Sequence, residues 1–190
     1  ADGFDDFIVG APFADAGTIA EAGYAAVYSG ATGTVLYEYY GSSDNSWLGY
    51  SVAGGGDING DGFDDFIIGA PRTPLSWIYK GEVYLYSGAD GSLLHQIQGA
   101  QWLDGCGTAV ANIGDLDGDG LSDTLVGAQW SGTYFQGHAY AYSGTTPHIW
   151  HDGSNPSGEF GQSVAGVGDI DGDGYDDYSI GSNSNAYVYS

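Results

Sequence analysis

The sequence predicts an all-β fold, in which four-stranded antiparallel sheets of the β-propeller blade type repeat along a single domain. Three observations predict it. A nine-residue acidic loop occurs three times at nearly constant spacing, short runs of β-branched and aromatic residues flank each copy, and no segment carries a sustained helical apolar stripe. The 190 residues suffice for one well-packed domain, and the 35 glycines suit short strands joined by tight turns.

The repeated loop has an acidic residue at its first and last positions and glycine at its fourth and sixth. The three copies begin at Asp57, Asp115 and Asp169, which are 58 and then 54 residues apart. Residues 2–6 match the second half of this loop. The chain therefore divides into four repeats of about 1–46, which is partial, 47–104, 105–158, and 159–190, which is also partial.

Each complete repeat has four predicted strands in the same order. In the second repeat, a small-residue strand at 49–53 precedes the loop, an apolar strand at 66–68 follows it, and two more strands lie at 83–88 and 93–97. The apolar runs are nearly continuous, which is typical of strands covered on both faces, so we expect the sheets to stack face to face.

The first repeat lacks its first strand and the last repeat lacks its fourth, and these two pieces do not replace one another. We therefore expect either a chain that continues in both directions or an assembly of several chains. The sequence has no methionine and no visible signal peptide, which favours a mature or excised piece of a longer chain.

The charge is strongly one-sided, with 25 acidic residues against Arg72 and Lys80 and a net charge of −23. Such a surface repels nucleic-acid phosphates and anionic lipids, and no apolar stretch is long enough to span a membrane, so neither nucleic-acid binding nor membrane insertion is expected. Sixteen carboxylates gather in the loops and the N-terminal half-loop, which indicates metal binding. Cys106 is the single cysteine, so no intrachain disulfide can form. We expect bound calcium to stabilise the fold instead.

Calcium takes six to eight oxygen ligands in flexible geometry, and alternate residues of a tight loop can direct oxygens to one centre. We therefore expect three complete Ca²⁺ sites, built from side chains at loop positions one, three, five and nine and the carbonyl at position seven. The predicted ligands are Asp57, Asn59, Asp61, Phe63 and Asp65; Asp115, Asp117, Asp119, Leu121 and Asp123; and Asp169, Asp171, Asp173, Tyr175 and Asp177. The N-terminal half-loop keeps a partial metal site of Asp2, Phe4 and Asp6.

Other interpretations of the loops are weaker. A plain Asp-Gly turn explains one loop but not three matched copies, and magnesium demands stricter octahedral geometry. A catalytic carboxylate pair is a singular feature, whereas these carboxylates recur in every repeat, so no catalytic residue and no enzyme is predicted. Two interpretations stay open for the tryptophans near loops, which either fill the space between blades or form a sugar- or protein-binding face: Trp47, Trp77, Trp102, Trp130 and Trp150.

The three loops, the Gly-Ala-Pro triplets at 10–12 and 69–71, and the Phe-Gly pair at 160–161 resemble the FG-GAP repeats of integrin α-subunit propellers and bacterial extracellular proteins. The resemblance covers essentially the whole chain, although Leu48 and Cys106 replace the phenylalanine in two repeats. It implies a non-catalytic, calcium-stabilised extracellular propeller for adhesion or recognition of a protein or glycan ligand. The alternatives are a structural subunit of an extracellular assembly, built from copies of itself, and an accessory domain of a secreted enzyme.

Overall fold

The computed structural model describes residues 3–75, 78–100, 103–132, 134–144, 146–153 and 157–190. These residues form sixteen strands and contain no helix. Within the same ranges there is accordingly no helix of the length and apolarity that crossing a bilayer requires. The predicted all-β class is confirmed.

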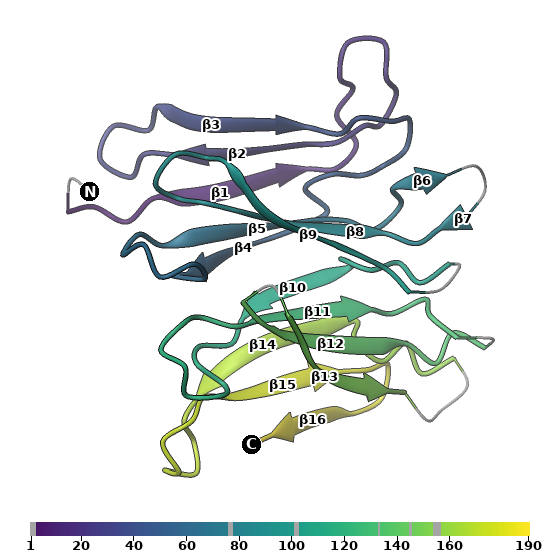
Figure 1. Ribbon diagram of the computed structural model, residues 1–190. Helices are drawn as coiled ribbons and strands as arrows, with labels where there is room; N and C mark the ends of the chain where they lie inside the picture. Colours follow the sequence, from purple (N-terminus) through teal and green to yellow (C-terminus); the bar gives the residue numbers. More distant parts are fainter. Residues whose placement is uncertain (1–2, 76–77, 101–102, 133, 145, 154–156) are drawn as a thin grey trace.

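Four antiparallel sheets follow one another along the chain and stack in that order (Figure 1). The first contains β1 (Phe7–Ala11), β2 (Tyr24–Tyr28) and β3 (Val35–Tyr40), and the second β4 (Ser51–Gly56), β5 (Asp65–Ala70), β8 (Glu82–Tyr86) and β9 (Leu93–Gln98). The third contains β10 (Ala109–Asn112), β11 (Thr124–Ala128), β12 (His138–Ser143) and β13 (Thr146–Asp152), and the fourth β14 (Ser163–Gly168), β15 (Asp177–Gly181) and β16 (Ala186–Tyr189). The strands of each sheet are adjacent in sequence order, as in propeller blades.

One element was not predicted. A two-stranded hairpin of β6 (Pro74–Leu75) and β7 (Ile78–Tyr79) interrupts the second sheet between β5 and β8. It projects from the side of the stack opposite the acidic loops (Figure 1). The sequence pattern missed it because strands of two residues carry no periodicity.

The sheets pack closely through glycine. Strand β4 contacts both β1 and β10, and β10 contacts β14, so the strands that face the neighbouring blades form one row. Beside this row, Gly69 of β5 lies against Gly107, and a Cβ at Gly69 would fall 2.3 Å from the Gly107 carbonyl oxygen. A side chain at this position would hold the sheets apart, which explains the glycine of the Gly-Ala-Pro triplet.

The core lies between the sheets. All six residues of β5 are buried, and they alternate in direction. Phe66 and Ile68 pack toward the first sheet, whereas Ile67 packs toward the third. Leu48 and Cys106 occupy equivalent positions in these two apolar clusters, and burial raises the pKa of the Cys106 thiol. This two-faced burial is the physical reason for the continuous apolar runs in the sequence.

Candidate metal centres

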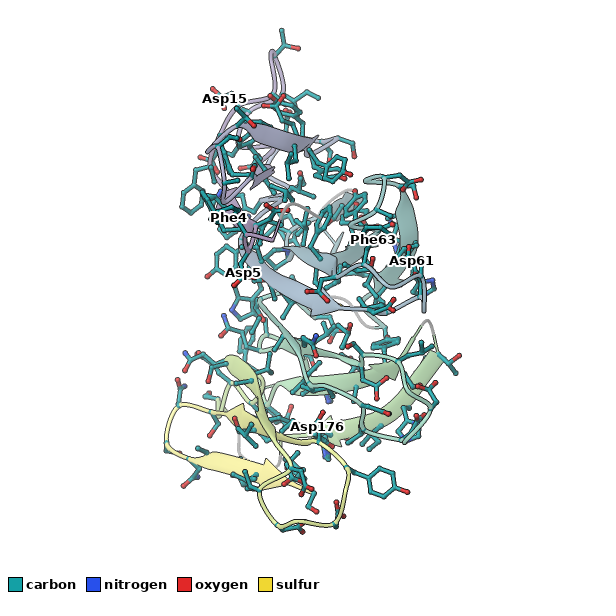
Figure 2. The ribbon with its side chains drawn as sticks, turned by 90° about the vertical axis from the view of Figure 1, so that its left-hand side faces the viewer. Phe4, Asp5, Asp15, Asp61, Phe63 and Asp176 are labelled. Atoms are coloured by element: carbon teal, nitrogen blue, oxygen red, sulfur yellow. The ribbon has the colours of Figure 1, made fainter. Side chains whose placement is uncertain are left out.

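The three acidic loops lie along one side of the stack. Each connects the first and second strands of its sheet, namely β4 to β5, β10 to β11 and β14 to β15. Because these connections are equivalent, the loops emerge on the same side, which Figure 2 shows facing the viewer with Asp61, Phe63 and Asp176 labelled.

The first residue of each loop organises the turn. In loop 57–65, Asp57 Oδ1 accepts the N–H groups of Gly60 and Asp61 at 2.7 and 3.0 Å, and Asp57 Oδ2 accepts that of Gly62 at 2.9 Å. Asp115 and Asp169 accept the corresponding three bonds. The backbone thus wraps around one carboxylate. The glycines at the sixth position, Gly62, Gly120 and Gly174, have φ angles of 86°, 86° and 98°. Such positive φ angles favour glycine.

The third and fifth residues turn their side chains into the same loop. Asn59 Oδ1 accepts the Asp61 N–H at 2.8 Å, and Asp61 Oδ1 accepts the Phe63 N–H at 2.9 Å. The other two loops repeat this pattern. The structure brings together two sets of three carboxylates, and within each set one oxygen of every residue lies within 4.8 Å of the others. The first set is Asp115, Asp117 and Asp119, and the second is Asp169, Asp171 and Asp177.

The last aspartate of each loop is buried and anchored by one oxygen. Asp65, Asp123 and Asp177 are 2%, 0% and 1% exposed. Their Oδ2 atoms accept the N–H of the second loop residue at 2.9, 2.8 and 2.8 Å. The Oδ1 of Asp65 accepts the N–H of Gly88 at 3.0 Å, whereas the Oδ1 of Asp123 is buried without a hydrogen-bond partner. A buried carboxylate oxygen without a partner is costly, so a cation is the missing component that fits.

The electrostatics of the loops agree with this interpretation. Burial raises the pKa of Asp123 to about 6, with further contributions from the carboxylates of Asp117, Asp119 and Asp115. Burial also raises the pKa of Asp65, while the N–H groups that it accepts oppose the shift. Carboxylates that resist ionisation together are expected where a bound cation would relieve the repulsion.

The structure does not bring every predicted ligand together. Among the described residues, loop 57–65 has no set of three acidic side chains within 4.8 Å, and the sets in the other two loops do not include Asp123 and Asp173. The third residue of loop 57–65 is Asn59, whose amide nitrogen donates to Asp61 Oδ2 at 3.0 Å. Phe63, Leu121 and Tyr175 each donate a backbone N–H to the fifth residue of their loop, and the role of their carbonyls stays a prediction.

The partial N-terminal site is described only in part. Asp2 lies outside the described residues, and the Phe4 side chain is exposed. Asp6 Oδ1 accepts the Gly30 N–H at 3.0 Å, the same bond that Asp65 accepts from Gly88. This half-loop therefore keeps the anchoring bond of a complete loop.

Successive loops also contact each other, which sequence reasoning missed. Ser122 N–H donates to the Asp57 carbonyl at 2.9 Å, and Asp176 N–H donates to the Asp115 carbonyl at 3.2 Å. Asp176 Oδ2 in turn accepts the Asp115 N–H at 3.0 Å. The eighth residue of one loop thus holds the first residue of the preceding loop, and only the stacking of the sheets produces this contact.

A comparison with protein families matches residues 48–86 to the family described as FG-GAP repeat. The chain is an FG-GAP repeat protein. The matched stretch runs from Leu48 through loop 57–65 to the end of β8, and it confirms the family that the motifs indicated.

The FG-GAP chain is also similar to integrin α chains. It is 34% identical to Integrin alpha-5 of Xenopus laevis and 31% identical to Integrin alpha-V of Gallus gallus, in each case over 95% of this chain but only 18% and 19% of the relative. It is 34% identical to human Integrin alpha-IIb over 77% of this chain and 16% of that protein. The chain thus spans about a fifth of the length of these relatives.

Proposed function

We propose that this chain is a non-catalytic, extracellular FG-GAP repeat protein whose blades bind calcium and act in adhesion or ligand recognition. The observation that carries the calcium part is the buried Oδ1 of Asp123, which has no hydrogen-bond partner and belongs to a loop in which the carboxylate oxygens of Asp115, Asp117 and Asp119 converge. Every donor in these loops is a hard oxygen, the type that calcium prefers.

Each loop would hold one ion through four side chains and one carbonyl. When bound, calcium supplies the positive charge that offsets the repulsion among the loop carboxylates. At a free calcium concentration about 100 times the dissociation constant, each site would add roughly 2.7 kcal/mol to the free energy of unfolding. The proposed ligands are Asp57, Asn59, Asp61, Phe63 and Asp65; Asp115, Asp117, Asp119, Leu121 and Asp123; and Asp169, Asp171, Asp173, Tyr175 and Asp177.

The similarity to integrin α chains supports the recognition role and the extracellular location. The ligand would be a protein or a glycan. A structural role in an assembly of copies of this chain is the second candidate, because each of the four stacked sheets has two edge strands among the described residues, and exposed strand edges favour further pairing.

A matched pair of variants tests the calcium proposal. Asp64 and Asp65 are adjacent and both acidic, but Asp65 is a proposed ligand and Asp64 is exposed and outside the set. Thermal unfolding and light scattering would be measured in millimolar calcium and in excess EDTA. We expect a discrete particle that loses stability in EDTA, and a smaller calcium effect in Asp65→Asn than in Asp64→Asn. Equal stability in calcium and EDTA would refute calcium binding, and polymers in calcium would favour the structural role.

A further inference from the structure

Arg72 has an unusual environment for a cation in so acidic a chain. It is one of two basic residues against 25 acidic ones. Its guanidinium carbon lies 4.2 Å from the ring centroid of Trp47 and 4.6 Å from that of Tyr79. No carboxylate of the described residues lies within ion-pair distance of it. Two aromatic rings, and no counter-charge, thus hold this cation in place.

Further rings extend the surface around Trp47. Tyr50 stacks on it with ring centroids 5.9 Å apart and an interplanar angle of 11°, and Phe13 meets it edge-on at 5.3 Å. Phe13 and Tyr50 are 61% and 39% exposed, so this cluster presents ring surface to solvent. The indole N–H donates to Glu21 Oε2 at 3.1 Å, which orients the Trp47 ring. We call Phe13, Trp47, Tyr50, Arg72 and Tyr79 the arginine–aromatic cluster.

In the next blade, the positions equivalent to Arg72 and Trp47 carry no charged residue. Trp130 lies three residues after Gly127, as Arg72 does after Gly69, and Gly105 occupies the position of Trp47. There the Trp130 ring covers the glycine, at 2.5 Å from where a Cβ of Gly105 would lie. The half-buried cation is therefore not a requirement of blade packing, and it calls for another explanation.

A small cavity adjoins the arginine–aromatic cluster. The backbone N–H of Arg72 donates to the backbone carbonyl of Ser46 at 3.3 Å. This bond joins the two segments that contribute residues both to the cluster and to the cavity. The cavity has a volume of about 160 Å³, and much of its wall consists of hydroxyl-bearing side chains, which are Tyr40, Ser42, Ser46, Thr73, Tyr84 and Tyr86. Ring faces, hydroxyls and one cation in succession are the groups that recognise a sugar acid.

At the next interface the equivalent residues form a different hydrogen bond. Asp104 replaces Ser46, whereas Tyr140 is the same residue as its equivalent Tyr84. The Asp104 carboxylate is fully buried and accepts the Tyr140 hydroxyl at 3.1 Å. The first interface has Ser46 in place of this carboxylate, and Ser46 lines the cavity.

We propose that the arginine–aromatic cluster and the adjoining cavity bind a sugar that carries one carboxylate. Arg72 would pair with the carboxylate through its planar fork, and the exposed rings of Phe13 and Tyr50 would cover the sugar face. The cavity hydroxyls would accept hydrogen bonds from the sugar hydroxyls, since those of Ser46, Thr73 and Tyr84 already donate to protein oxygens. The net charge of −23 disfavours a polyanion, so a single carboxylate on an otherwise neutral ligand fits best. This inference rests on the proposed recognition role and names the ligand class for it. It does not involve the calcium loops, which lie at the opposite end of the sheets (Figure 1).

The test is a titration of the calcium-saturated protein with D-glucuronic acid, followed by tryptophan fluorescence and ligand-observed NMR. D-Glucose and the methyl ester of glucuronic acid are the neutral comparisons. We expect saturable binding of the acid and at least about tenfold weaker binding of both neutral sugars, because a charge-assisted pair is lost. Arg72→Gln should weaken binding of the acid to the same degree, whereas Lys80→Gln, which removes the other basic side chain, should leave it unchanged.

Several results would overturn this assignment. One is the absence of saturable binding by calcium-saturated protein whose thermal unfolding shows that it is folded. The others are equal affinity for the acid and its methyl ester, and an equal loss of affinity for the acid in Arg72→Gln and Lys80→Gln. Arg72→Lys keeps the charge without the planar fork and covers the case that Arg72→Gln does not fold. Binding of N-acetyl-aspartate amide as tightly as the sugar acid would replace the sugar by an acidic peptide and so refute the ligand class. A protein that responds to calcium but binds no sugar acid would refute this inference alone.

Discussion

Asp123 uses its two carboxylate oxygens differently. Its Oδ2 accepts the Leu116 N–H at 2.8 Å and so ties the last residue of loop 115–123 to the second, while its buried Oδ1 has no hydrogen-bond partner. One oxygen therefore stabilises the loop whether or not a cation is present, and the other is available to a cation.

This division predicts that Asp123→Asn acts in opposite directions with and without calcium. In saturating calcium the free energy of unfolding should fall by about 2–3 kcal/mol, because a charged ligand is lost. In EDTA it should stay level or rise, since the amide oxygen still accepts the Leu116 N–H and a charge that burial disfavours is gone. Urea unfolding at pH 7.5 under both conditions measures this. The same loss in calcium and in EDTA would contradict it.

The contact between successive loops predicts that a residue outside a site tunes that site. Asp176→Ala removes the acceptor of the Asp115 N–H and should weaken calcium binding by loop 115–123 several-fold, in line with about 1 kcal/mol for one hydrogen bond. The affinity would be measured by calorimetric calcium titration. An Asp177→Asn background would weaken calcium binding by loop 169–177, so that the signal reports mainly on loop 115–123. Asp176→Asn keeps an oxygen acceptor and is the control. An unchanged affinity in the alanine variant would show that the loops bind independently.

Close approach of the sheets predicts different effects for two glycines of the second sheet. A Cβ at Gly69 would lie 2.3 Å from the Gly107 carbonyl oxygen, whereas a Cβ at Gly54 meets nothing within 4 Å. Gly69→Ala should therefore lower the free energy of unfolding by about 2 kcal/mol or more, and Gly54→Ala should change it by less than about 1 kcal/mol in either direction. Chemical unfolding in calcium compares the two. Similar values for both variants would show that the sheets can separate at little cost.

The pH dependence should include a contribution from His151. Burial lowers the pKa of His151, although the Asp152 carboxylate opposes the shift. Its Nε2 lies 2.7 Å from the Tyr178 hydroxyl, and its ring lies 4.0 Å from that of Tyr189, which joins the third and fourth sheets. The folded state holds fewer protons than the unfolded state here, so this stability is present above the ordinary pKa of 6.5 and is lost as the pH falls below it.

Urea unfolding at pH 7.5, 6.5 and 5.5 in saturating calcium would detect this contribution. His151→Phe should be less stable at pH 7.5 but should lose less stability toward pH 5.5 than the unsubstituted protein does. His95→Gln, on β9 of another sheet, serves as the control. An identical pH profile in His151→Phe would exclude His151 as a source of the acid sensitivity.

The sequence was enough to predict the all-β class and the position of every acidic loop. The apolar run at 66–68 lies in β5, and Gly62 has the positive φ that its loop position requires. These features depend on contacts between residues a few positions apart, such as the bonds from Asp57 to Gly60 and Gly62. Local hydrogen bonds and strand periodicity leave a direct pattern in the sequence, so a sequence pattern predicts them.

Only the tertiary structure decided which groups meet across the stacked sheets. Asp176 and Asp115 are 61 positions apart, and their contact depends on the offset between the third and fourth sheets. The position of Arg72 over Trp47 and Tyr79 likewise depends on how the second sheet stacks on the first and where the β6–β7 hairpin turns. Long-range packing sets these relationships, and one sequence contains no local pattern that specifies the distance between sheets.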